Sequence, residues 1–310
     1  MGQLKNQFSW SRSRARSLES CARQYWIHYY GSWGGWERNA PTDARQAYLL
    51  KQVVSRQMWV GSEVHDRVRK CLKILKAGQT PTLDEQMDSL VEHMRRQFRE
   101  SRTGDWVHNP KRILRLFEHE YALTIADEKW VEIRERAKNC LRGFFESPYF
   151  ELAKSLPPER WLAVEDLDQF DFEGTPVWVA LDFAFRREDG GCTIVDWKTG
   201  EHDEPEDHLL QMHTYALHAQ QKWGIPFERQ RLVAFSLARH HGDELAVDEA
   251  ALERSREAIR ASIAGMRERL VDADAARNVA ERDAFPMTDD RRTCRWCNFR
   301  RLCWPDGLLD

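Results

Sequence analysis

The chain has 310 residues, of which 42% are hydrophobic, which is enough for one elaborated domain or two small ones. Its formal net charge is −3, so the overall charge does not indicate a nucleic-acid binder. No stretch approaches the ~20 consecutive apolar residues of a membrane span, and the first residues lack the apolar centre of a signal peptide. We therefore expect a cytoplasmic protein without a membrane partner.

The first 150 residues or so have the periodicity of helices. We predict helices over about 12–30 and 42–76, one after Pro81, and one over about 127–145. Turn-rich stretches at 104–110 and 154–160 interrupt this region. The segment of about 41–158 is therefore expected to be a helical layer or insertion within one compact unit that spans 1–310.

From Trp161 the sequence alternates between apolar and polar residues, and turns separate three such segments. We predict an antiparallel meander that contains the stretches WLAVEDLDQFDFEG, PVWVALDFAFRR and CTIVDWK. A helix follows over about 206–223, then a strand over 231–239, a short strand near Leu245 and a long charged helix over about 249–270. This order predicts an α/β or α+β core with a mixed sheet, in which residues of about 159–240 form the central part.

Two acidic residues are expected to converge in the meander. The odd positions of 177–185 form an apolar face, which leaves Asp182 on the other face with Ala180 and Ala184. In the next strand Asp196 and Lys198 are two residues apart and share a face. Because a hairpin joins these strands, Asp182 and Asp196 can meet and bind a divalent cation such as Mg²⁺ or Mn²⁺.

This combination suits phosphodiester hydrolysis. A metal polarises the phosphate and lowers the pKa of bound water, and a lysine such as Lys198 stabilises charge or orients that water. The alternative is an Asp–Lys pair on an exposed strand, which the isolated triplet DWK does not exclude because short motifs are common by chance.

The surrounding residues resemble a known family. The segments LDFAF, IVDWKTG and QMHTYALHA, in that order, resemble the RecB-like branch of the PD-(D/E)XK nuclease superfamily. The resemblance implies a restriction-endonuclease-like mixed sheet flanked by helices. It also implies that Gln211 and Tyr215, four apart on one helix face, support the catalytic set of Asp182, Asp196 and Lys198.

The resemblance extends upstream to GSEVHDRV, where the family carries a metal-binding histidine, here His65. It implies that the metal is held by His65, Asp182, Asp196 and the main-chain carbonyl of Trp197. Relatives often have an acid at the position of Glu165. The chain departs from the family at Val179, where relatives often have a glycine that allows close approach of the DNA backbone.

The tail contains three clustered cysteines, Cys294, Cys297 and Cys303, in a C-x2-C-x5-C pattern that indicates metal or cluster ligation. The N-terminal helix around Cys21 resembles the iron–sulfur members of this nuclease group, such as the CRISPR-adaptation exonucleases and AddB-type nuclease domains. The resemblance implies that these four cysteines hold a [4Fe–4S] cluster that joins the two ends of the chain. A zinc site with four cysteine ligands is the alternative. The remaining cysteines are expected to be small buried hydrophobic residues, namely Cys71, Cys140 and Cys192.

Both ends of the chain are basic and would meet at this cluster. Six aromatic residues lie among the arginines, and we expect at least half of them to pack around the cluster: Trp10, Tyr25, Trp26, Trp296, Phe299 and Trp304. Exposed aromatics between cations can stack unpaired bases. The pattern therefore favours single-stranded or frayed DNA as the substrate.

The sequence thus predicts a Mg²⁺- or Mn²⁺-dependent deoxyribonuclease, in particular an exonuclease. The rival hypothesis is an inactive DNA-binding scaffold of a repair, recombination or defence complex, and no residue excludes RNA as the substrate. No Walker A motif is present in the sequence, so any ATP-driven unwinding would come from a helicase or recombination partner.

Overall fold

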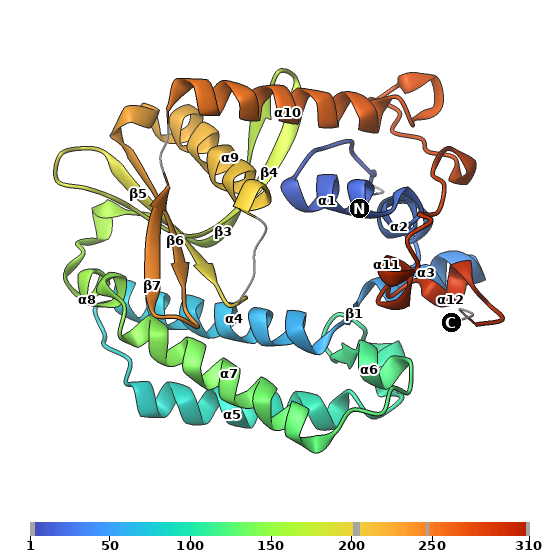
Figure 1. Cartoon of the computed structure of the whole chain (residues 1–310), viewed down its shortest axis with the longest axis horizontal. Helices are drawn as coiled ribbons and strands as arrows, with labels where there is room; N and C mark the ends of the chain where they lie inside the picture. The colour runs from blue at the N-terminus through green and yellow to red at the C-terminus, as the bar shows by residue number, and fades with distance from the viewer. Residues whose placement is uncertain (1–3, 201–204, 246–247, 308–310) are drawn as a thin grey trace.

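The computed structural model describes residues 4–200, 205–245 and 248–307. A five-stranded sheet lies between two layers of helices (Figure 1). The strand order is β3 (Trp161–Phe172), β4 (Thr175–Arg186), β5 (Cys192–Lys198), β6 (Gln230–Ser236) and β7 (His241–Leu245). The chain therefore has the α/β class and the sheet that its alternation pattern predicts.

The sheet is mixed. β3, β4 and β5 are antiparallel neighbours, which confirms the predicted meander. β5 and β6 are parallel, and α9 (Pro205–Trp223) makes the crossover that parallel pairing requires. β6 and β7 are again antiparallel. The ends of β5 and β6 consequently lie side by side, close to the start of α9.

The predicted first helix is interrupted. It consists of α1 (Arg12–Ser20), α2 (Ala22–Trp26) and a π-helical turn over Ile27–Gly31. The break is at Cys21, whose backbone is extended with φ −162° and ψ 113°. The expectation of one continuous helix over 12–30 was wrong because periodicity does not reveal a single extended residue between two helical turns.

The second predicted helix is also divided. α3 (Thr42–Lys51) and α4 (Arg56–Lys76) are separated by β1 (Val53–Val54), which pairs in parallel with β2 (Arg115–Leu116). The hydroxyl of Ser55 accepts a hydrogen bond from the backbone N–H of Met58 and so caps α4. The N-cap serine was the available signal for this break.

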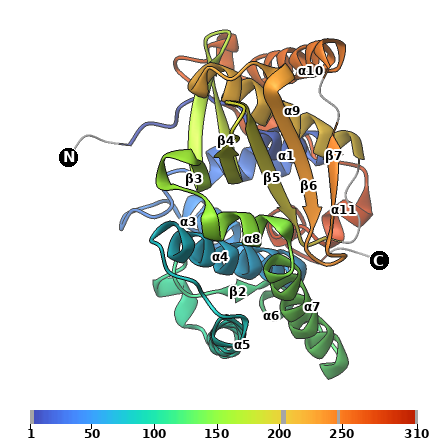
Figure 2. The same ribbon diagram turned by 90° about the vertical axis from the view of Figure 1, so that its left-hand side faces the viewer.

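One face of the sheet is covered by α4, α7 (Asp127–Phe145) and α8 (Pro148–Ser155), with α5 (Leu83–Glu100) packed outside them (Figure 2). The other face is covered by α9 and α10 (Glu249–Arg267). The remaining helices are short: α6 (Phe117–Glu120), α11 (Arg291–Arg295), α12 (Arg300–Cys303) and 3-10 turns at Asp105–His108, Pro158–Arg160, Phe227–Arg229, Val271–Ala273 and Arg282–Ala284. Among the described helices, none combines the length and apolarity that a bilayer crossing requires.

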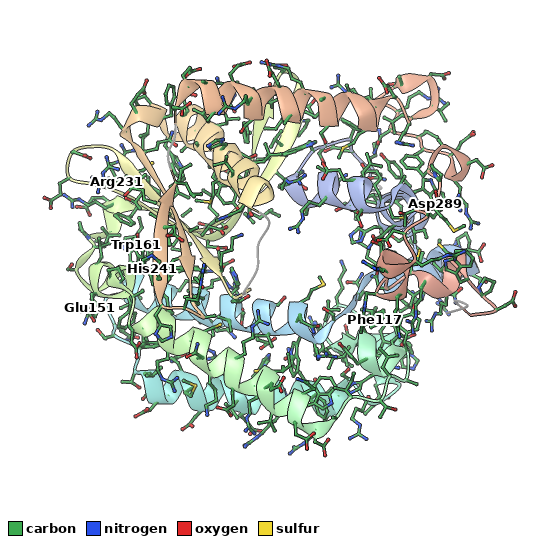
Figure 3. All side chains as sticks on the ribbon, viewed as in Figure 1. Phe117, Glu151, Trp161, Arg231, His241 and Asp289 are labelled. Atoms are coloured by element: carbon green, nitrogen blue, oxygen red, sulfur yellow. The ribbon has the colours of Figure 1, made fainter. Side chains whose placement is uncertain are left out.

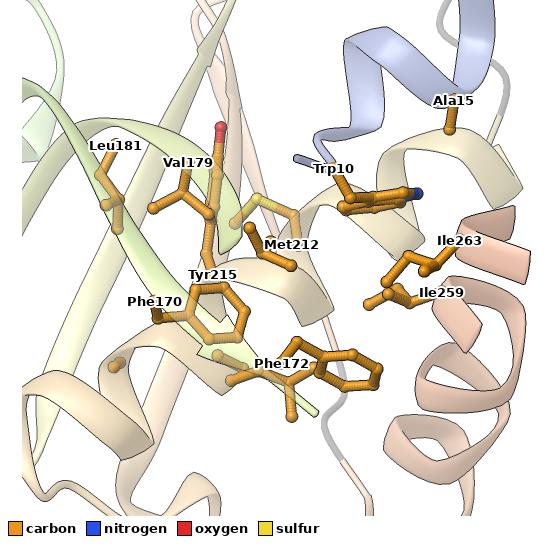
Figure 4. Packing of buried hydrophobic residues seen from close by; sticks show 14 of the residues in the cluster. Trp10, Ala15, Phe170, Phe172, Val179, Leu181, Met212, Tyr215, Ile259 and Ile263 are labelled. Atoms are coloured by element: carbon orange, nitrogen blue, oxygen red, sulfur yellow. The ribbon is translucent and has the colours of Figure 1, made fainter. Parts of the chain in front are cut away.

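The N-terminal segment is tied into the sheet. Trp10 extends the free edge of β4, where its N–H donates to the Pro176 carbonyl at 2.9 Å and its carbonyl accepts from Trp178 N–H at 2.8 Å. Its ring is fully buried near Met212 and Ile259 (Figure 4), and its indole N–H donates to Ser262. The first helices are thereby fixed close to α9 and α10.

β4 changes face at Asp182. The odd positions are all buried, but Val177, Val179 and Leu181 belong to the core cluster under α9, whereas Phe183 and Phe185 belong to the cluster under α4. The single continuous apolar face that we expected is therefore wrong. Opposite this point in β3, Glu165 has a positive φ of 49°, so both strands are irregular where the carboxylates lie.

Candidate active site

A cleft lies where β4 and β5 separate, because their pairing extends only as far as Phe183 and Val195. Its lining comes from α4, β4, the end of β5 and α9: His65, Ala180, Asp182, Asp196, Trp197, Lys198, Thr199, Gly200, Gln211 and Tyr215. The crowded view of Figure 3 shows the side chains of these elements around the centre of the molecule. All the residues that we predicted for the carboxylate site line this cleft.

On one side of the cleft, a histidine lies between two acids. His65 Nδ1 is 2.9 Å from Glu165 Oε1 and 3.4 Å from Asp182 Oδ1. These three side chains place potential ligand atoms within 4.8 Å of one another. β3 is irregular at Glu165, whose side chain contacts His65 of α4.

Asp182 is held by the backbone of the next strand, since its Oδ2 accepts a hydrogen bond from Trp197 N–H at 2.7 Å. Burial raises the pKa of Asp182 to about 6, and repulsion from Asp196 adds to this effect although His65 opposes it. Burial alone would lower the pKa of His65, but Asp182 and Glu165 outweigh it and raise that pKa well above its ordinary value.

Asp196 lies beside a lysine and a histidine. Its Oδ2 is 2.9 Å from Lys198 Nζ and 3.3 Å from His208 Nε2, yet neither contact has good hydrogen-bond geometry within the described part of the chain. Burial tends to raise the pKa of Asp196, but His208 and Lys198 outweigh it and lower that pKa. The carboxylate is thus ionised at neutral pH, and among the described residues its Oδ2 has no well-directed hydrogen-bond donor.

Gln211 and Tyr215 connect the lysine to the second acid. Lys198 Nζ donates to Gln211 Oε1 at 3.3 Å, and Gln211 Nε2 lies 3.3 Å from Asp196 Oδ1 and 2.7 Å from Tyr215 Oη. Tyr215 donates to the Ala180 carbonyl at 2.7 Å. Burial, together with the nearby Asp196, raises the pKa of Tyr215 well above its ordinary value, so its hydroxyl remains a donor.

The donor set fits a divalent metal. Carboxylate oxygens suit Mg²⁺ and Mn²⁺, whereas imidazole is typical of transition-metal sites. Two buried carboxylates repel each other unless a cation lies between them. Asp182 and Asp196 are 7% and 3% exposed, and Asp196 Oδ2 lacks a well-directed partner among the described residues. Asp196 faces Lys198 and His208, whereas Glu165 completes the close group with His65 and Asp182.

His208 is a neighbour of the site that the sequence analysis did not single out. It lies three residues before Gln211 and seven before Tyr215, so all three occupy one face of α9. This spacing was the available signal. The two residues that follow Lys198 were quoted within IVDWKTG but were given no role: Thr199 and Gly200 line the cleft.

The four predicted cysteines share a second cavity. Cys21, Cys294, Cys297 and Cys303 line it together with residues such as Ile27, Phe299 and Trp304. Burial raises the pKa of Cys297 to about 12, and the proximity of the other three thiols contributes to that shift. Within the described residues, only the group of His65, Glu165 and Asp182 brings three ligand atoms within 4.8 Å, so the thiols form a looser set.

The other cysteines are fully buried elsewhere in the core, as expected for Cys71, Cys140 and Cys192.

Of the six aromatic residues near the basic ends, Trp10, Tyr25 and Phe299 are buried. Trp296 is 57% exposed, and the guanidinium of Arg291 lies 3.9 Å from the ring centre of Trp304. Fewer of these rings are therefore accessible at the surface than the sequence suggests.

A family model described as the PD-(D/E)XK nuclease superfamily matches residues 9–304. The match covers the cleft, the cysteine cavity and the helical layer alike. No curated protein gives a significant match to this chain.

Proposed function

Because the chain belongs to the PD-(D/E)XK nuclease superfamily, we propose that it is a Mg²⁺- or Mn²⁺-dependent deoxyribonuclease of the RecB-like branch. Its substrate would be single-stranded or frayed DNA, degraded from an end. The main support is the convergence of His65, Asp182, Asp196 and Lys198 on one cleft from three separate elements. An inactive scaffold would have no need for this complete set.

In this proposal His65, Asp182, Asp196 and the carbonyl of Trp197 hold the metal, with Glu165 beside His65. A bound divalent ion supplies Lewis-acid polarisation of the phosphate and a lower pKa for water. Lys198, positioned by Gln211, offers its ammonium group to the developing negative charge or to the attacking water. Tyr215 keeps Gln211 in place and is itself anchored on the Ala180 carbonyl.

We further propose that Cys21, Cys294, Cys297 and Cys303 hold a [4Fe–4S] cluster, with zinc as the alternative occupant. Their common cavity and their closely spaced tail support this proposal. The cluster would join the two ends of the chain and has no part in hydrolysis. The basic residues around it, together with exposed Trp296, would contact DNA, and a helicase or recombination partner would supply the ends.

The experiment is degradation of end-labelled single-stranded DNA with Mn²⁺ by anaerobically purified protein. Wild type is compared with Lys198→Ala and with Lys222→Ala, a matched control whose lysine lies at the far end of α9, away from the cleft. Duplex DNA and single-stranded RNA of the same sequence are included as parallel substrates.

We expect wild type and Lys222→Ala to release short products from single-stranded DNA and Lys198→Ala to release none. Binding of DNA without cleavage by all three proteins would favour the scaffold. Preferred cleavage of the RNA would identify RNA as the substrate in place of DNA, and the proposed nuclease centre would stand.

A further inference from the structure

One face of α7 is attached to the ends of the two central strands. Arg136, Asn139 and Gly143 follow at spacings of three and four residues, so they share a face of this helix. Each of them approaches a backbone carbonyl at the end of β5 or just beyond β6: those of Thr199, Ala238 and Leu237. Through Arg136, α7 therefore contacts Thr199, which lines the cleft.

The contact made by Arg136 is directed at the cleft itself. Its Nη2 donates to the Thr199 carbonyl at 2.6 Å, and its Nε donates to the same oxygen at 3.1 Å. Thr199 follows Lys198 directly and, with Gly200, lines the cleft. A charged donor that makes two hydrogen bonds to one carbonyl fixes the orientation of that peptide group.

A second helix, α4, also lies close to Thr199. A Cβ at Gly61 in α4 would lie 3.2 Å from Thr199 Oγ1, so α4 is in close contact with this residue. The preceding carbonyl, that of Lys198, accepts a hydrogen bond from Leu237 N–H at 2.8 Å. The backbone around Lys198 is thus held by α4, α7 and the segment after β6.

Asn139 provides an internal comparison. Its Nδ2 donates to the Ala238 carbonyl at 2.8 Å from the same face of α7. This bond also attaches the helix to the sheet, but Ala238 lies outside the cleft lining. Loss of Asn139 should therefore weaken helix docking without displacing Lys198.

We infer that Arg136 is a positioning residue for the nuclease reaction, and this inference rests on the proposed function. It holds the Thr199 peptide and thereby sets the position of the Lys198 ammonium group relative to Asp196 and Gln211. The helical layer then contributes directly to catalysis through one side chain, because small displacements of a catalytic group cost large factors in rate.

The test compares Arg136→Met, Arg136→Lys and Asn139→Ala by kcat and KM on single-stranded DNA, with Tm measured for each. Arg136→Met should lower kcat by roughly 100-fold with little change in KM. Arg136→Lys, which retains one donor, should recover part of the loss. Asn139→Ala should keep nearly full kcat even if its Tm falls as far as that of Arg136→Met.

A second readout does not depend on cleavage. Amide hydrogen exchange is followed in the peptide that contains residues 198–200, and Arg136→Met, but not Asn139→Ala, should accelerate it. If wild type cleaves nothing, the proposed function fails, and this exchange result alone decides whether Arg136 holds the segment. Equal kcat losses in Arg136→Met and Asn139→Ala, or equal exchange in both, would overturn the inference.

Discussion

The cleft and the cysteine cavity are built from opposite kinds of residues. The cleft collects ionised groups, Asp182, Asp196, His65 and Lys198, from elements that the sheet brings together. The cysteine cavity brings together four thiols from the two ends of the chain. The cleft thus concentrates charged groups, whereas the cysteine cavity connects the two ends of the chain.

Activity and stability should therefore depend on different regions. Burial holds the pKa of Asp182 at about 6, so ionising it near neutral pH costs folding free energy while no cation is bound. Residues of the cleft should be replaceable without loss of the fold. The cysteine cavity connects segments far apart in sequence, so its disruption should cost mainly stability.

The largest expected effect is on activity in the cleft. Asp196→Asn should lower kcat by about 1,000-fold or more, because the carboxylate is proposed both to bind the metal and to pair with Lys198. Its Tm should fall only modestly, because His208 and Lys198 stabilise the ionised carboxylate while its burial opposes them. Asp243→Asn, on the exposed strand β7, is the control and should leave kcat unchanged. A large loss of Tm in Asp196→Asn would contradict the view that the cleft determines activity and the cysteine cavity determines stability.

At the cysteine cavity, a substitution should mainly reduce stability. Cys294→Ser should abolish iron and sulfide content and lower the free energy of unfolding by ~3 kcal/mol or more, since the two chain ends are no longer joined. Chemical denaturation under anaerobic conditions measures this loss. The control is Cys71→Ala, which should retain full metal content because Cys71 is buried apart from the cavity. Stoichiometric zinc without iron in wild type would favour the alternative site.

Metal binding in the cleft should depend on pH. Asp182, with its pKa of about 6, and His65, whose pKa is raised, must both lose a proton before they bind a cation. Mn²⁺ affinity, measured by calorimetry, should therefore rise between pH 5 and 7 by up to ~10-fold per pH unit for each proton released. Affinity that does not change over this range would show that these groups are not ligands.

A separate pH effect, on stability, is expected near the cysteine cavity. Burial, with help from Lys51 and Arg14, lowers the pKa of His28 to about 3. Below about pH 6.5, His28 becomes protonated in the unfolded chain but stays neutral in the folded chain. The free energy of unfolding therefore decreases as the pH falls from 6.5 toward 3. This loss amounts to at most ~1.4 kcal/mol per pH unit. His28→Leu should show a correspondingly flatter pH dependence in chemical denaturation.

The sheet and its motifs were predictable because alternation and spacing are local. The meander, the crossover helix and the convergence of Asp182, Asp196 and Lys198 follow from such patterns, whereas Gln211 and Tyr215 were assigned to the site only through the family resemblance. The breaks at Cys21 and at 52–55 were not predicted, because one or two extended residues leave periodicity intact.

The neighbours of the site that the sequence did not reveal depend on tertiary structure. Glu165 faces His65 only because β3 and β4 are irregular at the same place. Arg136 reaches Thr199 only because α7 packs against the strand ends, a contact between residues 63 positions apart. The family resemblance drew attention to Glu165 but not to its contact with His65, and no local pattern pointed to Arg136.

The central claim is that the paired carboxylates bind the catalytic ion, and anomalous diffraction from crystals soaked in Mn²⁺ tests it most directly. We predict a manganese peak bonded to Asp182 and Asp196, with His65 and the Trp197 carbonyl as further ligands. A fully soaked crystal with no peak in the cleft, or a peak that avoids both carboxylates, would contradict this claim.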